Sequence, residues 1–149
     1  MVIGKVLSLY VAPPKTSGVR EQKEKIVIKN GGVVGDKFAK KLEQSVMIVG
    51  QKPYILAKEN LNINLPNAAL GENILLSFNP HELKEGSILE IGGAVLQITQ
   101  ACTLCKHLTK YHNKLPKLIL KSRGIYCKVL QDGIIKVGDS VKILERLSA

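Results

Sequence analysis

Short runs rich in valine, isoleucine and leucine, separated by turn-forming residues, constrain the fold of this chain more than any other feature. Hairpin turns are expected at Gly31-Gly32, Gly92-Gly93 and Asp132-Gly133, which lie between such runs. The sequence therefore predicts a β-rich, mixed α/β fold built as an antiparallel or mixed β-barrel. The runs that are typical of strands cover residues 2–12, 25–30, 45–50, 72–78, 87–100, 124–139 and 140–145.

Helical patterns are few. The best candidates are residues 51–63 and 115–123, and residues 102–112 are compatible with a short turn of helix. The polar segment 12–25 is expected to be a loop or a sheet edge. With 149 residues, 45% of them hydrophobic, the chain is expected to form one domain, residues 1–149, with a sizeable core.

The sequence favours a cytoplasmic protein with no membrane partner. No apolar run approaches the roughly 20 residues of a transmembrane helix. The apolar N-terminus lacks an A-x-A-like cleavage site. Three cysteines, an odd number, argue against a disulfide framework. In a reducing cytosol, a C-x-x-C pair is more often a metal, redox or catalytic feature.

The formal net charge of +10 favours anionic partners such as nucleic acid or a phosphorylated small molecule. No aspartate or glutamate occurs from Ile91 through Gln131, although this span is rich in lysine. Aromatic residues make up only 4% of the chain and tryptophan is absent, so stacking platforms for bases are scarce. A nucleic-acid-binding basic β-barrel is therefore the weaker alternative.

The basic segment contains the C-x-x-C pair Cys102 and Cys105. A zinc site would use both thiols and His112, with a fourth ligand from His107 or Cys127. The second C-x-x-C or H-x-x-x-H pair that is usual for structural zinc is missing. A dithiol redox pair is also open, although such pairs usually cap a helix in an α/β fold.

A single activated cysteine accounts for both the thiols and the missing acids. Cations favour thiolate over thiol, and Lys106, Lys110, His107 and Arg123 could supply such a field. The same cations would hold a phosphate beside the thiolate. Alternatively, the cysteines are small core hydrophobes. This last interpretation suits Cys127 best, since its strand neighbours are apolar.

Four motifs occur in order along the chain: VVGDKF (33–38), LGENILL (70–76), LEIGGAVLQITQACTLC (89–105) and RGIYCKVLQDGIIKVGD (123–139). Together they resemble the MOSC domain, the family named after the C-terminal domain of molybdenum cofactor sulfurase. The resemblance spans nearly the whole chain and implies a barrel-like domain that binds molybdenum cofactor or carries sulfur on a cysteine. A chain of this length is expected to lack the pyridoxal-phosphate desulfurase domain of the long sulfurases.

The resemblance also implies roles for individual residues. Cys105 matches the cysteine that ligates molybdenum in related reductases, and Cys102 takes an accessory position. Many relatives have Pro-Arg where this chain has Ala101 and Cys102, and many have histidine where it has Phe38. Cys105 would thus act as a sulfur carrier or as a molybdenum ligand. In both cases the expected partners are a molybdopterin-type cofactor and a protein that donates sulfur or electrons.

Three further residues are candidate cofactor ligands beside Cys102 and Lys106. Glu72 and Asn73 could bond a pterin-like ring, or they could cap their own turn. Arg123 suits phosphate binding, although a surface ion pair is equally ordinary. We expect the Gly-Glu-Asn turn, Arg123 and Cys105 to converge on one cleft. Asp36 and Asp139 are expected to be structural turn residues.

Overall fold

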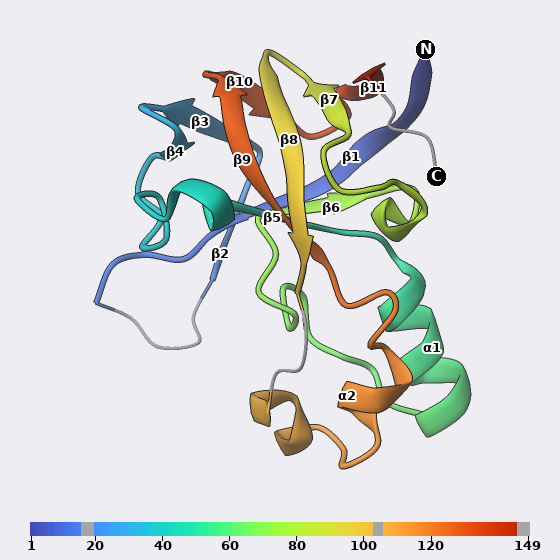
Figure 1. The fold of residues 1–149 in the computed structure, drawn as a ribbon. Helices are drawn as coiled ribbons and strands as arrows, with labels where there is room; N and C mark the ends of the chain where they lie inside the picture. The colour runs from blue at the N-terminus through green and yellow to red at the C-terminus, as the bar shows by residue number, and fades with distance from the viewer. Residues whose placement is uncertain (16–19, 103–105, 146–149) are drawn as a thin grey trace.

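A computed structural model describes residues 1–15, 20–102 and 106–145 of the chain. Within these residues an eight-stranded sheet runs in the order β11-β7-β8-β9-β5-β6-β1-β2, and pairing of β11 with β1 closes seven strands into a barrel (Figure 1). The predicted barrel is confirmed. Its strands are β1 (Val2–Val11), β5 (Val46–Val49), β6 (Ile74–Leu76), β7 (Ile88–Ile91), β8 (Ala94–Ala101), β9 (Ile125–Gln131) and β11 (Ser140–Glu145).

The long strand β1 closes the barrel because it changes partners along its length. Its first residues pair with β11, its middle with β6, and its last residues with β2 (Glu21–Lys23). The register shifts between Val2 and Gly4, within the pairing with β11, and between Val6 and Ser8, within the pairing with β6. All three residues of β2 are exposed, so the expected edge within residues 12–25 is an edge strand.

Strand β5 is buried on both faces, which explains its uninterrupted apolar sequence. Val46 and Ile48 belong to the core inside the barrel, whereas Met47 and Val49 belong to a second cluster outside it. Side chains alternate between the faces of a strand, so one run of four residues serves both cores. The second core lies beneath the helices.

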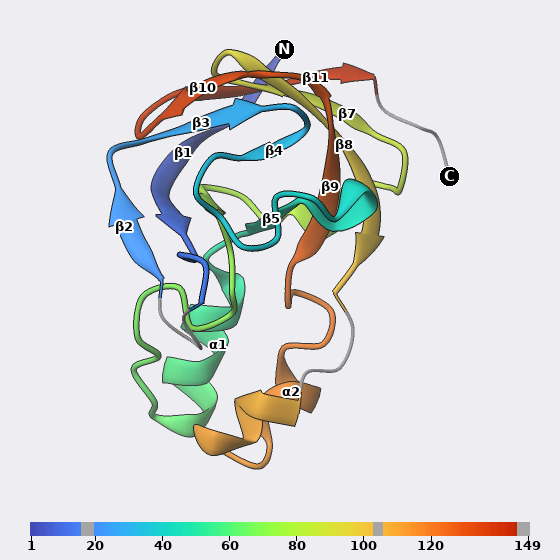
Figure 2. The same cartoon turned by 90° about the vertical axis from the view of Figure 1, so that its left-hand side faces the viewer.

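The helices gather at one end of the barrel (Figures 1 and 2). Helix α1 (Lys52–Leu61) joins the parallel strands β5 and β6, and the prediction for residues 51–63 is confirmed. Helix α2 (Leu115–Leu118) is shorter than predicted, because the chain turns after Ile119 and enters β9. Single 3-10 turns occur at η1 (Leu42–Gln44), η2 (Pro80–Glu82) and η3 (Lys106–Lys110).

A small sheet of β10 (Gly133–Lys136), β3 (Lys25–Lys29) and β4 (Gly32–Val33) lies at the other end of the barrel. The hairpin predicted at Asp132-Gly133 is wrong, because β10 leaves β9 and pairs with β3. The Asp132 carboxylate accepts N–H groups from Asn30, at 2.8 Å, and Gly31, at 3.0 Å. These bonds join the turn to the distant β3–β4 hairpin. The hairpin at Gly92-Gly93 is confirmed.

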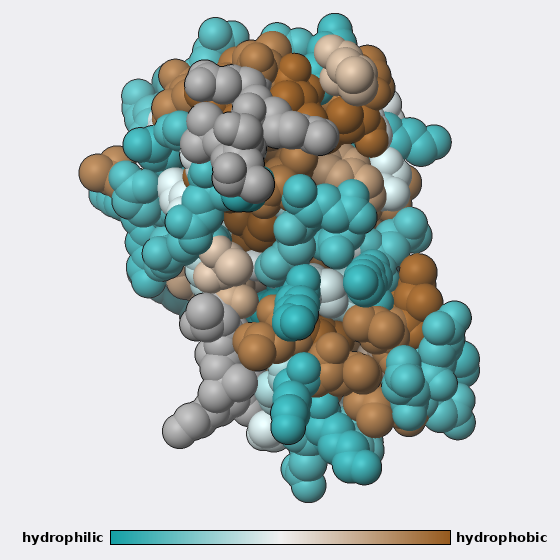
Figure 3. Space-filling model, turned by 45° about the vertical axis from the view of Figure 1, so that its right-hand side comes forward, coloured by the Kyte–Doolittle hydropathy of each residue, from teal (hydrophilic) through white to brown (hydrophobic). Residues whose placement is uncertain are grey.

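The surface mixes polar and apolar side chains. On the face shown in Figure 3, apolar residues interrupt the hydrophilic surface over both the barrel and the helical end. Large exposed apolar side chains include Leu42, Ile55 and Leu144. Among the described residues, no helix combines the length and apolar character needed to cross a membrane.

Candidate active site between the Gly-Glu-Asn turn and β9

The turn that carries Gly71, Glu72 and Asn73 lies just before β6 and separates two cavities. Gly71 has a φ of +85°, a left-handed conformation that favours glycine. A cavity of about 220 Å³ lies on one side, where Gly71 and Asn73 form part of the wall. A second cavity, of about 480 Å³, lies on the other side, and Glu72 faces it. The turn therefore presents successive side chains to different cavities.

Arg123 is the most deeply buried cation of the smaller cavity, with 3% of its surface exposed. One guanidinium nitrogen donates to the carbonyl oxygen of Leu70 at 2.6 Å. Its Nε is buried and has no hydrogen-bond partner among the described residues. A buried guanidinium with an unused donor is costly unless something anionic completes it.

Arg20 is the second guanidinium of this cavity. It lies 4.0 Å from the Asp36 carboxylate and donates weakly to the backbone oxygen of Glu72, at 3.4 Å. Burial lowers the pKa of Arg20 below its usual value, and the charge of Asp36 opposes this shift. The cation lies over the ring of Phe38, 5.8 Å from its centre.

Two lysines share the Phe38 ring with Arg20. Lys37 and Lys41 lie 5.3 and 5.2 Å from the ring centre. An aromatic ring attracts cations, so one phenylalanine holds three of them together. Lys41 also lines the cavity. Position 38, where many relatives have histidine, is therefore surrounded by three cations in this chain.

Asn73 and Asp36 form the polar support of the cavity. The Asn73 side-chain oxygen accepts the N–H of Met47 at 3.0 Å, and its nitrogen donates to Tyr10 and Asp36, both at 3.2 Å. Asp36 also accepts the N–H of Ala12 at 2.7 Å, as expected of a structural turn residue. Both Asn73 N–H donors are thus used within the fold, and its role toward a ligand stays a prediction.

Cys102 is buried next to a residue that lines this cavity. Its N–H donates to the carbonyl of Gly124 at 2.8 Å, directly after Arg123. Its thiol donates to the hydroxyl of Tyr126, a cavity residue, at 3.5 Å. Cys105, the expected working cysteine, lies outside the described residues, as does the Lys106 side chain. Their roles therefore stay predictions.

Cys127 belongs to the core, as expected. It is fully buried inside the barrel, and burial raises the pKa of its thiol well above the usual range. Among the described residues, no cluster of three or more histidine, cysteine or acidic side chains could hold a metal ion. The zinc and dithiol alternatives depend on Cys105, which the structure does not describe.

His81 bonds the backbone beside Arg123. Its Nε2 accepts the N–H of Gly124 at 2.9 Å, so the neutral ring is required at this position. Burial lowers the pKa of His81, and the charge of Lys52 lowers it further. The histidine thus fixes the backbone next to Arg123.

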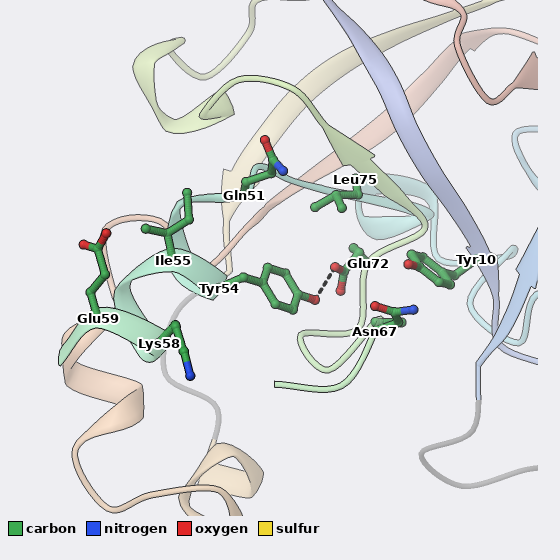
Figure 4. A pocket seen from close by; sticks show the side chains of 10 residues that line it. Tyr10, Gln51, Tyr54, Ile55, Lys58, Glu59, Asn67, Glu72 and Leu75 are labelled. Atoms are coloured by element: carbon green, nitrogen blue, oxygen red, sulfur yellow. Dashed lines mark hydrogen bonds between the residues drawn. The ribbon is translucent and has the colours of Figure 1, made fainter. Parts of the chain in front are cut away.

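The Glu72 side chain faces the larger cavity, not the arginine-lined one. Its side chain is fully buried, and the hydroxyl of Tyr54 donates to its Oε2 (Figure 4). Burial raises the pKa of the Glu72 carboxyl, against the lowering effects of Tyr54 and of the two arginines. The Gly-Glu-Asn turn was expected to converge with Arg123 on one cleft. Gly71 and Asn73 line the same cavity as Arg123, whereas the Glu72 side chain lines the other one.

A comparison of the sequence with family models gives one match. A family model described as MOSC domain matches residues 33–142. The chain belongs to the MOSC domain family. No curated protein matches the chain.

Solved structures share the fold of this chain. The YiiM structure from Geobacillus stearothermophilus has a TM-score of 0.78 at 22% identity, covering 96% of this chain and 76% of that one. The YuaD protein from Bacillus subtilis has a TM-score of 0.78 at 22% identity, covering 94% of both chains. YiiM from Escherichia coli has a TM-score of 0.73 at 17% identity, covering 99% and 72%.

The sequence did not indicate several residues that line the smaller cavity. Arg20, Phe38 and Lys41 were not among the predicted ligands, although all three line the smaller cavity. Tyr126 was missed as well. Arg20 follows a polar loop with no periodic pattern, so no local signal marks it. The residue at position 38 was noted only as a departure from many relatives.

Proposed function

We propose that this MOSC domain binds a molybdopterin-type cofactor, or a related ligand with a phosphate group, in the smaller cavity. Cys105 acts beside it, either as a sulfur carrier or as a molybdenum ligand. A partner protein donates the sulfur or the electrons. The proposal for Cys105 rests on its match to the family motif and on its position three residues after Cys102.

The buried guanidinium of Arg123 carries the proposal. It lines the cavity with a positive charge, and its Nε has no hydrogen-bond partner within the described part of the chain. Arg20 and Lys41 add two more cations, and Asp36 is engaged with backbone N–H groups. Arginine binds phosphate oxygens with paired N–H donors, so a phosphate group satisfies this site.

The size of the cavity suggests which part of the cofactor it holds. At about 220 Å³, it is smaller than the sites of about 300–1,000 Å³ that enclose drug-sized ligands. We therefore assign it to the phosphate end of the cofactor, which Arg123, Arg20 and Lys41 would hold. When bound, molybdopterin supplies the dithiolene sulfurs that carry molybdenum and thus its redox chemistry.

Sulfur transfer at Cys105 would require the thiolate. The thiolate attacks the outer sulfur of a donor persulfide, R–S–SH, and a new S–S bond forms as the bond within the donor breaks. The donor leaves as R–S⁻, so no net oxidation occurs. Cations around residues 102–123 favour the thiolate that starts this step.

Pterin retention tests the proposal. The chain is purified from a host that makes molybdopterin, and the released pterin is oxidised and measured by fluorescence. We expect Arg123→Gln to retain about tenfold less pterin, since a charge-assisted pair is lost. Lys121→Gln is the matched control, because it removes the same charge from an exposed side chain two residues away.

Two results would contradict this function. Equal pterin in the Arg123 and Lys121 variants would remove the cavity from cofactor binding. An unmodified chain that carries no pterin but absorbs strongly at 260 nm would favour the nucleic-acid alternative.

A further inference from the structure

The larger cavity has the features of a ligand site that is independent of the arginine-lined one. It lies between α1 and the segment that leads into β6 (Figure 4). Its volume, about 480 Å³, falls in the range of small-molecule sites, roughly 300–1,000 Å³. The two cavities share only the Gly-Glu-Asn turn, and they receive different side chains from it.

The Glu72 carboxyl is the polar group buried at this cavity, and its hydrogen bonding is incomplete. The Tyr54 hydroxyl donates to Oε2, whereas Oε1 has no hydrogen-bond partner among the described residues. Arg20 donates to the backbone oxygen of Glu72. Among the described residues no ion pair joins a cation to the carboxylate, although the charges of Arg20 and Arg123 act on it. A buried carboxylate oxygen in this state is costly, and an incoming N–H donor would remove the cost.

The walls specify the rest of the ligand. Tyr10 and Tyr54 present aromatic rings on either side of the carboxyl, and Leu75 and Ile55 add apolar surface (Figure 4). Aromatic rings attract organic cations, and a carboxylate pairs with them. At the rim, the charges of Lys58 and Glu59 offset each other.

We propose that this cavity binds a small organic cation, an ammonium or amidinium group on an apolar body. The N–H donor of the ligand reaches Glu72 Oε1, and the body of the ligand lies against Tyr54 and the apolar side chains of Ile55 and Leu75. Asn67 lies next to the carboxyl in Figure 4 and is exposed. Its side chain can therefore turn aside without losing a buried contact and open the path to Oε1.

Benzamidine is the probe, because it joins an amidinium to an aromatic ring of suitable size. Titration of the unmodified chain should shift the NMR signals of the Ile55, Ala68 and Leu75 methyl groups. Benzamide has the same shape without the charge, and we expect it to bind about tenfold more weakly or worse.

Two variants separate Glu72 from general attraction to acidic groups. Glu72→Gln keeps an oxygen that can accept from Tyr54 and should lower benzamidine affinity about tenfold or more. Glu59→Gln removes the same charge from the exposed rim, and we expect a change of less than about twofold.

The proposal fails if millimolar benzamidine leaves the three methyl signals unchanged or shifts only signals elsewhere. It also fails if benzamide binds equally well, or if the Glu59 variant loses as much affinity as the Glu72 variant. If Glu72→Gln does not fold, the unmodified chain still tests whether the cavity binds an organic cation, through the methyl shifts and the comparison of benzamidine with benzamide.

Discussion

Arg123 donates a 2.6 Å hydrogen bond to the carbonyl oxygen of Leu70, across 53 residues of sequence. The bond ties the start of β9 to the turn that separates the two cavities. It uses one guanidinium nitrogen and leaves Nε without a partner among the described residues. Arg123 therefore holds the turn in place and keeps one charged donor that no described residue uses.

Phosphate should stabilise the folded chain through Arg123. We expect inorganic phosphate to raise the unfolding temperature of the unmodified protein, because a ligand that binds only the folded state stabilises it. Arg123→Gln should lose most of this response and about 1–3 kcal/mol of stability with the bond to Leu70. Thermal unfolding at several phosphate concentrations measures both. An unchanged response in this variant, with Lys121→Gln as control, would rule out Arg123 as the anion ligand.

Glu72→Gln should change how stability depends on pH. The pKa of Glu72 is raised by burial, so its contribution to stability is fully present below the unfolded value of 4.5 and is lost as pH rises through the folded pKa. Glutamine has no such dependence. The variant should therefore gain stability relative to the unmodified chain between pH 4 and pH 8. Urea unfolding at both pH values tests this, and a relative loss toward pH 8 would contradict it.

Protonation of His81 should loosen the site. Because its folded pKa lies below the usual 6.5, its contribution is present above pH 6.5 and is lost as pH falls through the folded pKa. The protonated ring can no longer accept the Gly124 N–H. His81→Asn should cost about 1 kcal/mol at pH 7.5 if its amide does not replace this bond. Between pH 8 and pH 5, the free energy of unfolding should fall less steeply in the variant than in the unmodified chain. Parallel curves for the two proteins would show that His81 is not the group responsible for the loss.

The three cysteines should differ in reactivity. Cys105 should react first with iodoacetamide near neutral pH, because its sequence surroundings are cationic. Cys102 is 7% exposed and should react more slowly. Cys127 should react last, because it is fully buried and its thiol pKa is raised. Mass spectrometry of partly labelled protein gives the order, and early labelling of Cys127 would overturn it.

Serine substitutions separate a working cysteine from a packing one. Cys105→Ser should abolish pterin retention or sulfur transfer with little change in stability, since a hydroxyl is neither a persulfide carrier nor a comparable molybdenum ligand. If Cys105 were a core residue, the variant would instead lose about 1–3 kcal/mol of stability. Cys102→Ser is the control with the smaller functional effect. Equal functional loss from both would indicate a dithiol or zinc site.

The sequence by itself determined the barrel, helix α1 and the buried position of Cys127. These depend on local signals: alternating or continuous apolar runs, turn residues such as Gly92-Gly93, and helical spacing after Gln51. The order of the MOSC motifs added the family, which the match to residues 33–142 confirms. Each signal lies within one short segment, so it can be read without knowing what that segment contacts.

Only the tertiary structure decided which side chains share a cavity. Glu72 and Asn73 are neighbours in sequence, yet one meets Tyr54 and the other meets Asp36. Arg20 reaches Arg123's cavity from a polar loop, and β10 finds β3 rather than the adjacent β9. These pairings join residues tens of positions apart, and their free energy comes from burial and hydrogen bonds that exist only once the barrel has closed.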